Sequence, residues 1–212
     1  MNGSQAATLL RNRLTLFSTS AGTVLTEEIL LQELNLAMQR LEKEKVLPFF
    51  LISEEARENT IIDDERVKVP ARFLREIEAD SLWVFDAAGK RHLMKKGFLD
   101  TIRMSYPDPG MPKEYSLHGF YYRVRPIPNA VFVVSMTYYK GDDPIVADEE
   151  NQWLTYEPDL LMAETGHVVA ILYLRDERAQ AKFESWRNEC YVRMVNNETA
   201  RMQINTNPNP ED

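Results

Sequence analysis

The chain has 212 residues, of which 44% are hydrophobic and 27% are charged. This composition supplies enough apolar side chains for a core and excludes an intrinsically disordered chain. Thirty-three acidic and 25 basic residues give a formal net charge of -8, which argues against a surface built for general binding to phosphate backbones.

Cysteine content and apolar runs indicate where the chain is made. Cys190 is the only cysteine, so the chain forms no internal disulfide. The first thirteen residues lack the apolar core and cleavage site of a secretory signal. No run approaches the roughly 20 apolar residues that a helix needs to cross a bilayer. We expect a soluble protein that is synthesised in the cytoplasm and has no membrane partner.

The N-terminal part is predicted to be helical. Thr26 is a good N-cap, and Glu27 and Glu28 follow it at the positive end of the helix dipole. Apolar residues then recur at helical spacing, at Leu30, Leu34, Ala37 and Leu41. Pro48 ends this helix. A shorter helix is predicted before it, over residues 5–16.

The middle part, residues 67–140, has the alternation and turn residues of β-strands. A strand around Leu82 and Val84 is closed by a turn at residues 86–89. Residues 106–112 contain three prolines and a glycine and are predicted to form a loop. Two strands flank the turn at residues 126–129, and the second is apolar on both faces.

The last third returns to helical spacing. Pro158 suits the first turn of a helix, and Asp176 suits the N-cap of the next one. That last helix is predicted to run to about Gln203, with apolar residues at Ala179, Phe183, Trp186, Cys190 and Met194.

These elements predict an α+β fold, a mainly α-helical bundle with an inserted small antiparallel β domain. Residues 1–66 would form N-terminal helices and residues 67–146 the β-rich insertion. Residues 147–204 would form C-terminal helices packing with 1–66, and residues 205–212 a flexible tail.

Few residues suggest chemistry, and we expect no enzyme, cofactor or metal. An acidic cluster is better explained as a solvated charged face than as a cation site, because it lacks the spacing of a binding loop. It comprises Glu54, Glu55, Glu58, Asp63, Asp64 and Glu65. Cys190 lies on the apolar stripe, which predicts a core thiol with a raised pKa.

Histidines and basic residues point to no site either. His92, His118 and His167 are too far apart in sequence to suggest a shared metal, and surface or packing roles are expected. Gly166, next to His167, predicts a close approach between helices. Five cations could meet phosphate, but solvation or a subunit contact is favoured: Arg91, Lys95, Lys96, Arg123 and Arg125.

Three segments, in order, resemble a family of tailed-bacteriophage head-to-tail adaptor (connector) proteins. In the first, a Gly-x-Pro, a tyrosine, a Pro-x-Pro and a Tyr-Tyr pair match the family at Gly110, Pro112, Tyr115, Pro126, Pro128, Tyr138 and Tyr139. In the second, the matching residues are Asn151, Trp153, Pro158, Asp159, Leu160, Tyr173, Leu174 and Asp176. The third is the helix centred on residues 34–37, which resembles an Ile-Asn-x-Ala motif. Val69 before Pro70, and the polar residues around Gly166, depart from the family pattern.

The resemblance implies a structural virion protein in the neck between capsid and tail. It would dock on the portal protein as one copy in a twelvefold ring and extend the DNA channel towards a downstream tail or nozzle protein. Packaged double-stranded DNA would pass through without specific binding. Because related adaptors contact the portal through their C-terminal region, the expected contacts are Trp186, Tyr191, Arg193 and Arg201.

Two other functions remain open. A different neck or tail component, such as a tail-tube or fibre-attachment protein, would share the acidic composition and bind tail proteins in preference to the portal. A cation-dependent hydrolase would use the acidic cluster around Asp63 and Asp64.

Overall fold

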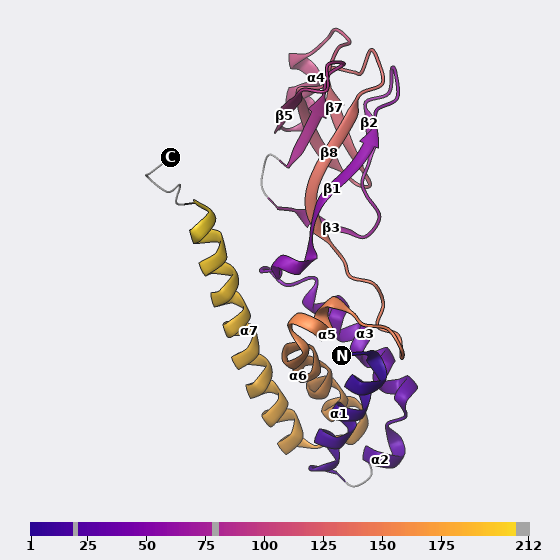
Figure 1. Ribbon diagram of the computed structural model, residues 1–212, viewed down its shortest axis with the longest axis vertical. Helices are drawn as coiled ribbons and strands as arrows, with labels where there is room; N and C mark the ends of the chain where they lie inside the picture. Colours follow the sequence, from indigo (N-terminus) through magenta and orange to yellow (C-terminus); the bar gives the residue numbers. More distant parts are fainter. Residues whose placement is uncertain (19–20, 78–80, 207–212) are drawn as a thin grey trace. The chain divides into compact units, whose positions relative to one another are not determined.

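The computed structural model describes residues 1–18, 21–77 and 81–206, leaving aside the side chains of residues 54, 55 and 203–206. The chain divides into two compact units (Figure 1). Unit 1 combines Met1–Leu51 with Gly141–Asp212, and unit 2 is Ile52–Lys140. The predicted flexible tail lies outside the described residues from residue 207 onwards.

Unit 1 is helical. Its elements are α1 (Gly3–Thr15), α2 (Ala21–Val24), α3 (Glu27–Leu41), a 3-10 turn at Phe49–Leu51, α5 (Gln152–Tyr156), α6 (Pro158–Val169), a π-helical segment at Ala170–Leu174 and α7 (Glu177–Thr206). The start of α3 confirms the prediction, because the Thr26 hydroxyl accepts a hydrogen bond from the Ile29 amide.

The core of unit 1 forms where α1, α3, α6 and α7 meet. Its buried residues are Ala7, Leu10, Leu14, Ala21, Leu25, Leu30, Val169 and Phe183. Gly166 brings α6 close to α7, since a Cβ at this position would lie 2.2 Å from Cε1 of Phe183. The close helix approach predicted for Gly166 is therefore confirmed.

Unit 2 is built on a sheet with one short helix. Its elements are β1 (Ile52–Asn59), β2 (Arg66–Lys68), β3 (Phe73–Glu76), β4 (Leu82–Phe85), β5 (Arg91–Lys96), α4 (Leu99–Ser105), β6 (Glu114–His118), β7 (Tyr121–Arg125) and β8 (Val133–Lys140). The order is β1-β8-β4-β5-β6-β7-β2, and β3 pairs with β8. The predicted turn after β4 is present, with Gly89 at φ 78°.

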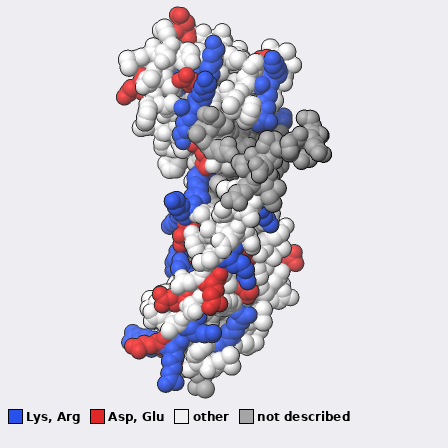
Figure 2. All heavy atoms as spheres, turned by 90° about the vertical axis from the view of Figure 1, so that its left-hand side faces the viewer, with Lys and Arg blue, Asp and Glu red and all other residues white. Residues whose placement is uncertain are grey.

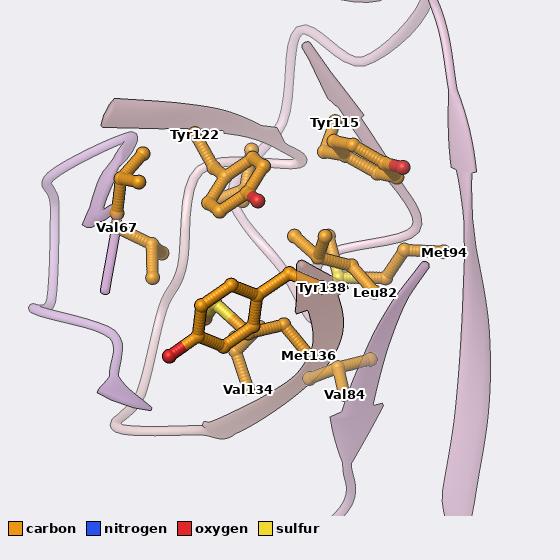
Figure 3. Close-up of a cluster of buried hydrophobic side chains, with 11 residues drawn as sticks. Val67, Leu82, Val84, Met94, Tyr115, Tyr122, Val134, Met136 and Tyr138 are labelled. Atoms are coloured by element: carbon orange, nitrogen blue, oxygen red, sulfur yellow. The ribbon is translucent and has the colours of Figure 1, made fainter. Parts of the chain in front are cut away.

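Apolar side chains fill the inside of this sheet (Figure 3). The cluster comprises Val67, Val69, Leu82, Val84, Met94, Tyr115, Tyr122, Val124, Val134, Met136 and Tyr138. The rings of Tyr115 and Tyr122 meet edge to face at 5.7 Å between centroids. Because residues from six strands contribute, this core holds the sheet in its curled shape.

The predicted fold class is wrong. Only 46% of the chain is helical and 22% is strand, so it is not a mainly helical bundle. The sheet is a curled half-barrel rather than a small antiparallel domain, and it is mixed because β5 and β6 run parallel. Strand β1 was not predicted, because its sequence, ISEEAREN, lacks the apolar alternation that is typical of a strand. As an edge strand, β1 accommodates charges that a central strand would not.

Candidate functional site

Helix α7 carries all four residues that the sequence singled out. Asp176 caps it, since the carboxylate accepts a hydrogen bond of 2.9 Å from the Ala179 amide. One face is buried against unit 1 through Ala179, Phe183, Cys190 and Met194, each no more than 3% exposed. The long amphipathic helix predicted from the apolar spacing is thereby confirmed.

The four predicted contact residues do not share one face of α7. The guanidinium of Arg13 lies 4.3 Å from the centre of the half-buried Trp186 ring. Tyr191 projects from the other side of the helix and donates a hydrogen bond of 3.4 Å to Glu44. Arg193 is exposed. Arg201 is also exposed, and its guanidinium lies 3.6 Å from the centre of the Phe49 ring.

A groove of about 410 Å³ lies beside Trp186. Its lining combines aromatic rings with charges of both signs and comprises Arg13, Leu16, Phe17, Asp159, Lys182, Phe183, Trp186 and Glu189. Leu16, at the end of α1, is 83% exposed. Sequence reasoning missed Leu16 and Phe17, although an apolar pair that continues past a helix end is a readable signal.

A second groove, of about 390 Å³, lies on the opposite flank of α7. It is lined by Arg40, Glu164, His167, Val168, Ile171, Leu172 and Arg187. Arg187 and Arg40 both bind Glu164. The π-helical segment displays Ile171, Leu172 and Tyr173 at 41%, 60% and 36% exposure. No motif in the sequence predicted this segment, because a π-helix has no reliable residue signature.

Burial shifts the ionisation of groups on α7 and next to it. Desolvation raises the pKa of Glu198 on α7 and of Glu157, which precedes α6. Burial likewise raises the pKa of the Cys190 thiol, which is 3% exposed. The core cysteine predicted from the sequence is confirmed, and such a thiol reacts slowly.

Two members of the acidic cluster of unit 2, Glu65 and Asp64, are bound to arginines. Glu65 accepts bonds from Arg103 at 2.6 Å, Arg125 at 2.6 Å and Arg123 at 3.2 Å. Hydrogen bonding, above all from Arg103, lowers the pKa of Glu65. With its side chain 14% exposed, Glu65 is not part of a solvated face, and that expectation is wrong for this residue.

The rest of the cluster shows no binding geometry. Asp64 binds Arg66 at 2.8 Å, and this hydrogen bonding lowers the pKa of Asp64. Asp63 has a φ of 62° in the turn before β2. The side chains of Glu54 and Glu55 lie outside the described residues. Among the residues that are described, no three histidines, cysteines or carboxylates gather as metal ligands do.

The cations for which solvation or a subunit contact was expected, in preference to phosphate binding, are largely engaged within unit 2. Arg123 and Arg125 bind Glu65, and Lys96 binds Glu76. Arg91 stacks on Trp83 at 3.9 Å. These contacts favour packing over phosphate binding.

The three histidines lie apart in the structure. His92 pairs with Asp86 at 2.8 Å between Nε2 and the carboxylate. His118 is exposed at the end of β6, and His167 is partly buried on α6.

The residues that carry the family resemblance hold the fold together. The Asn35 amide accepts a bond from the Ile145 amide at 2.8 Å and donates one to the Ile145 carbonyl at 2.9 Å. Asn151 caps α5, and Trp153 behind it is fully buried. Tyr138 and Tyr139 are each 4% exposed. The motifs therefore identify a shared scaffold.

The protein presents two surface grooves and a long helix with one exposed face. Its lineage is shown by comparison with known families. The model of the family described as SU10 adaptor protein matches residues 1–206, and the chain belongs to that family. It is a family of structural phage adaptor proteins. No curated protein matched the sequence.

No helix among the described residues is long and apolar enough to cross a membrane.

Proposed function

We propose that this chain is the head-to-tail adaptor subunit of a phage neck. It docks on the portal protein as one copy in a ring, twelvefold to match the portal, and extends the DNA channel towards the next tail or nozzle protein. The observation that carries this proposal is the family match over residues 1–206. The two surface grooves and the exposed face of α7 supply contact area for such an assembly.

The portal contact is proposed for α7 at Trp186, Tyr191, Arg193 and Arg201. Arg193 and Arg201 support it best, because both are exposed on the half of the helix nearer the C-terminus. Trp186 and Tyr191 support the proposed portal contact less well. Arg13 covers the Trp186 ring, and the Tyr191 hydroxyl is hydrogen-bonded to Glu44. Planar guanidinium groups suit carboxylates or backbone carbonyls on the partner.

Passage of DNA without binding follows from charge. The chain carries a net charge of -8, and a ring multiplies that charge by the number of copies. Repulsion of like charge opposes the counterion release on which adhesive DNA binding depends. A ring structure with a basic lumen would contradict this part of the proposal.

The test is sedimentation of the purified protein with and without the portal protein encoded by the same phage. We expect a small species alone and a stoichiometric ring on the portal. Truncation after Asn197 should abolish docking, and so should Arg193→Glu combined with Arg201→Glu. Lys43→Glu combined with Lys45→Glu, at exposed positions after α3, is the charge-matched control. Binding to tail proteins in place of the portal would move the protein further down the tail.

A further inference from the structure

Between residues 177 and 184, the charges on α7 are sorted by sign. With about 100° of rotation per residue, Arg178 and Lys182 project roughly 90–130° to one side of the buried face. Glu177 and Glu184 project by a similar angle to the other side. All four side chains are exposed. Figure 2 looks onto the side of unit 1 along which α7 runs and shows acidic and basic side chains close together there.

These four charges have no ion-pair partner within the described part of unit 1. None of the ion pairs among the described residues includes Glu177, Arg178, Lys182 or Glu184. Arg178 and Lys182 are four residues apart, a spacing at which like charges disfavour a helix by a few tenths of a kcal/mol. The neighbour that could pair with Glu184 along the helix, Arg187, is bound to Glu164 and Glu44. Within one copy only Glu177 gains, because it lies in the first turn of α7 at the positive end of the helix dipole.

Each charged flank borders a different apolar surface. The basic flank adjoins the groove that contains Leu16, Phe17 and Trp186. The acidic flank adjoins the π-helical segment, where Ile171 and Leu172 are 41% and 60% exposed. One flank therefore places Arg178 and Lys182 beside the groove, which Asp159 and Glu189 also line, and the other places Glu177 and Glu184 beside protruding apolar side chains.

We infer that these two flanks are the two halves of one head-to-tail contact between successive copies of this chain. The acidic flank of one copy lies against the basic flank of the next, and its Ile171 and Leu172 enter the groove beside Trp186. A closed ring needs two different, complementary surfaces of this kind, whereas a twofold dimer needs one surface that complements itself. The inference rests on the proposed ring.

Cyclic symmetry strengthens the match. Rotation about a ring axis keeps every residue at its own height, so charges that pair between copies must lie at one level. The acidic and basic residues all fall between residues 177 and 184, about 10 Å of helix at 1.5 Å per residue. Trp186 is assigned here to the contact between copies, whereas the proposed function assigns it to the portal contact. The experiments below distinguish these two assignments.

The first experiment is a disulfide cross-link in the full-length protein, alone at high concentration and bound to the portal. Lys182→Cys combined with Glu184→Cys should give a ladder of oligomers on oxidation, because each bond joins position 182 of one copy to 184 of the next. Lys182→Cys alone should give monomer. The native Cys190 is buried and serves as the background in the wild type. A dimer from Lys182→Cys alone, or no ladder from the double variant, overturns the inference.

The second experiment uses charge reversal. Arg178→Glu with Lys182→Glu should weaken ring assembly at least tenfold, and Glu177→Lys with Glu184→Lys should do the same. The quadruple variant, with both flanks reversed, should regain assembly, since the flanks are again complementary. Failure of the quadruple variant to assemble, with helix content unchanged by circular dichroism, contradicts the inference.

These results are separable from the proposed function. A wild-type protein that binds the portal while the double-cysteine variant gives no ladder retains the adaptor function and loses this contact. A ladder from a protein that ignores the portal retains the contact and removes the adaptor function.

Discussion

Two largely buried carboxylates in this protein bind arginines that are distant in sequence. Glu65 gathers three arginines that lie 38, 58 and 60 residues further along the chain. Glu164 binds Arg40 and Arg187 in the same way across three helices. Such networks fix the positions of strands and helices because a carboxylate with one missing partner stays buried and poorly paired.

Replacing Glu65 by glutamine should destabilise unit 2 by about 3 kcal/mol, because partly buried arginines lose their counter-charge. Asp64→Asn is the control and should lose less than about 1 kcal/mol, since its partner Arg66 is largely exposed. Urea denaturation at pH 7 measures both.

The pH dependence gives this prediction a second readout. Because the pKa of Glu65 is lowered in the folded state, its stabilisation is present above the ordinary value of 4.5 and is lost as the pH falls through the folded pKa. The difference between wild type and Glu65→Gln should therefore shrink in acid. A difference that stays constant with pH would mean that shape, and not charge, is responsible.

Glu198 should behave in the opposite way. Burial raises its pKa, so the stability that it contributes is complete below pH 4.5 and is lost as the pH rises through the folded pKa. Glu198→Gln should raise the unfolding temperature at pH 7 and change it little at pH 4. Glu184→Gln, exposed on the same helix, should leave thermal unfolding unchanged at both pH values.

Gly166→Ala should destabilise unit 1 by about 2 kcal/mol, because the new methyl group overlaps the Phe183 ring. Gly22→Ala is the matched control in unit 1, where the nearest side-chain atom is 3.8 Å away, and it should be neutral. Thermal unfolding followed by circular dichroism distinguishes them.

The helices and strands that could be predicted are those whose sequence signals lie within a few residues of one another. Thr26 and Asp176 predicted the starts of α3 and α7, because an N-cap depends on residues three positions apart. Strand β1 and the π-helical segment were missed. The pairing of β1 with β8 depends on residues about 80 positions away, and the widened turn of a π-helix depends on tertiary packing.

The cap of α7 can be tested directly. Asp176→Ala should lower stability by about 1 kcal/mol and fray the first turn, where Glu177 and Arg178 lie. Asp176→Asn keeps an acceptor for the Ala179 amide and should lose less. Hydrogen exchange of the first-turn amides measures the fraying, and equal exchange in the two variants would argue against a capping role.

For the molecule as a whole, the chain enters and leaves unit 2 at one place. Ile52 and Tyr139 are partners in the antiparallel pair of β1 and β8. Sequence patterns could locate helix-rich ends and a strand-rich middle, because periodicity is local. They could not give the half-barrel, since its mixed order joins strands whose contacts are not sequential.

Residues 52–140 should fold when expressed alone, since the unit has its own buried core. The remainder, with a short Gly-Ser linker replacing residues 52–140, should stay helical because the two cut ends are neighbours. Circular dichroism and cooperative thermal unfolding of both fragments measure this, and a molten residue 52–140 fragment would show that unit 2 needs unit 1 to fold.

The paired entry and exit also have a mechanical consequence. A force that draws the two units apart reaches unit 2 through β1 and β8 at the same end, and so pulls along the strands. Hydrogen bonds in an antiparallel sheet lie perpendicular to the strands, so those between β8 and its neighbour β4 are loaded together in shear. These hydrogen bonds therefore resist such a force together and do not break one after another.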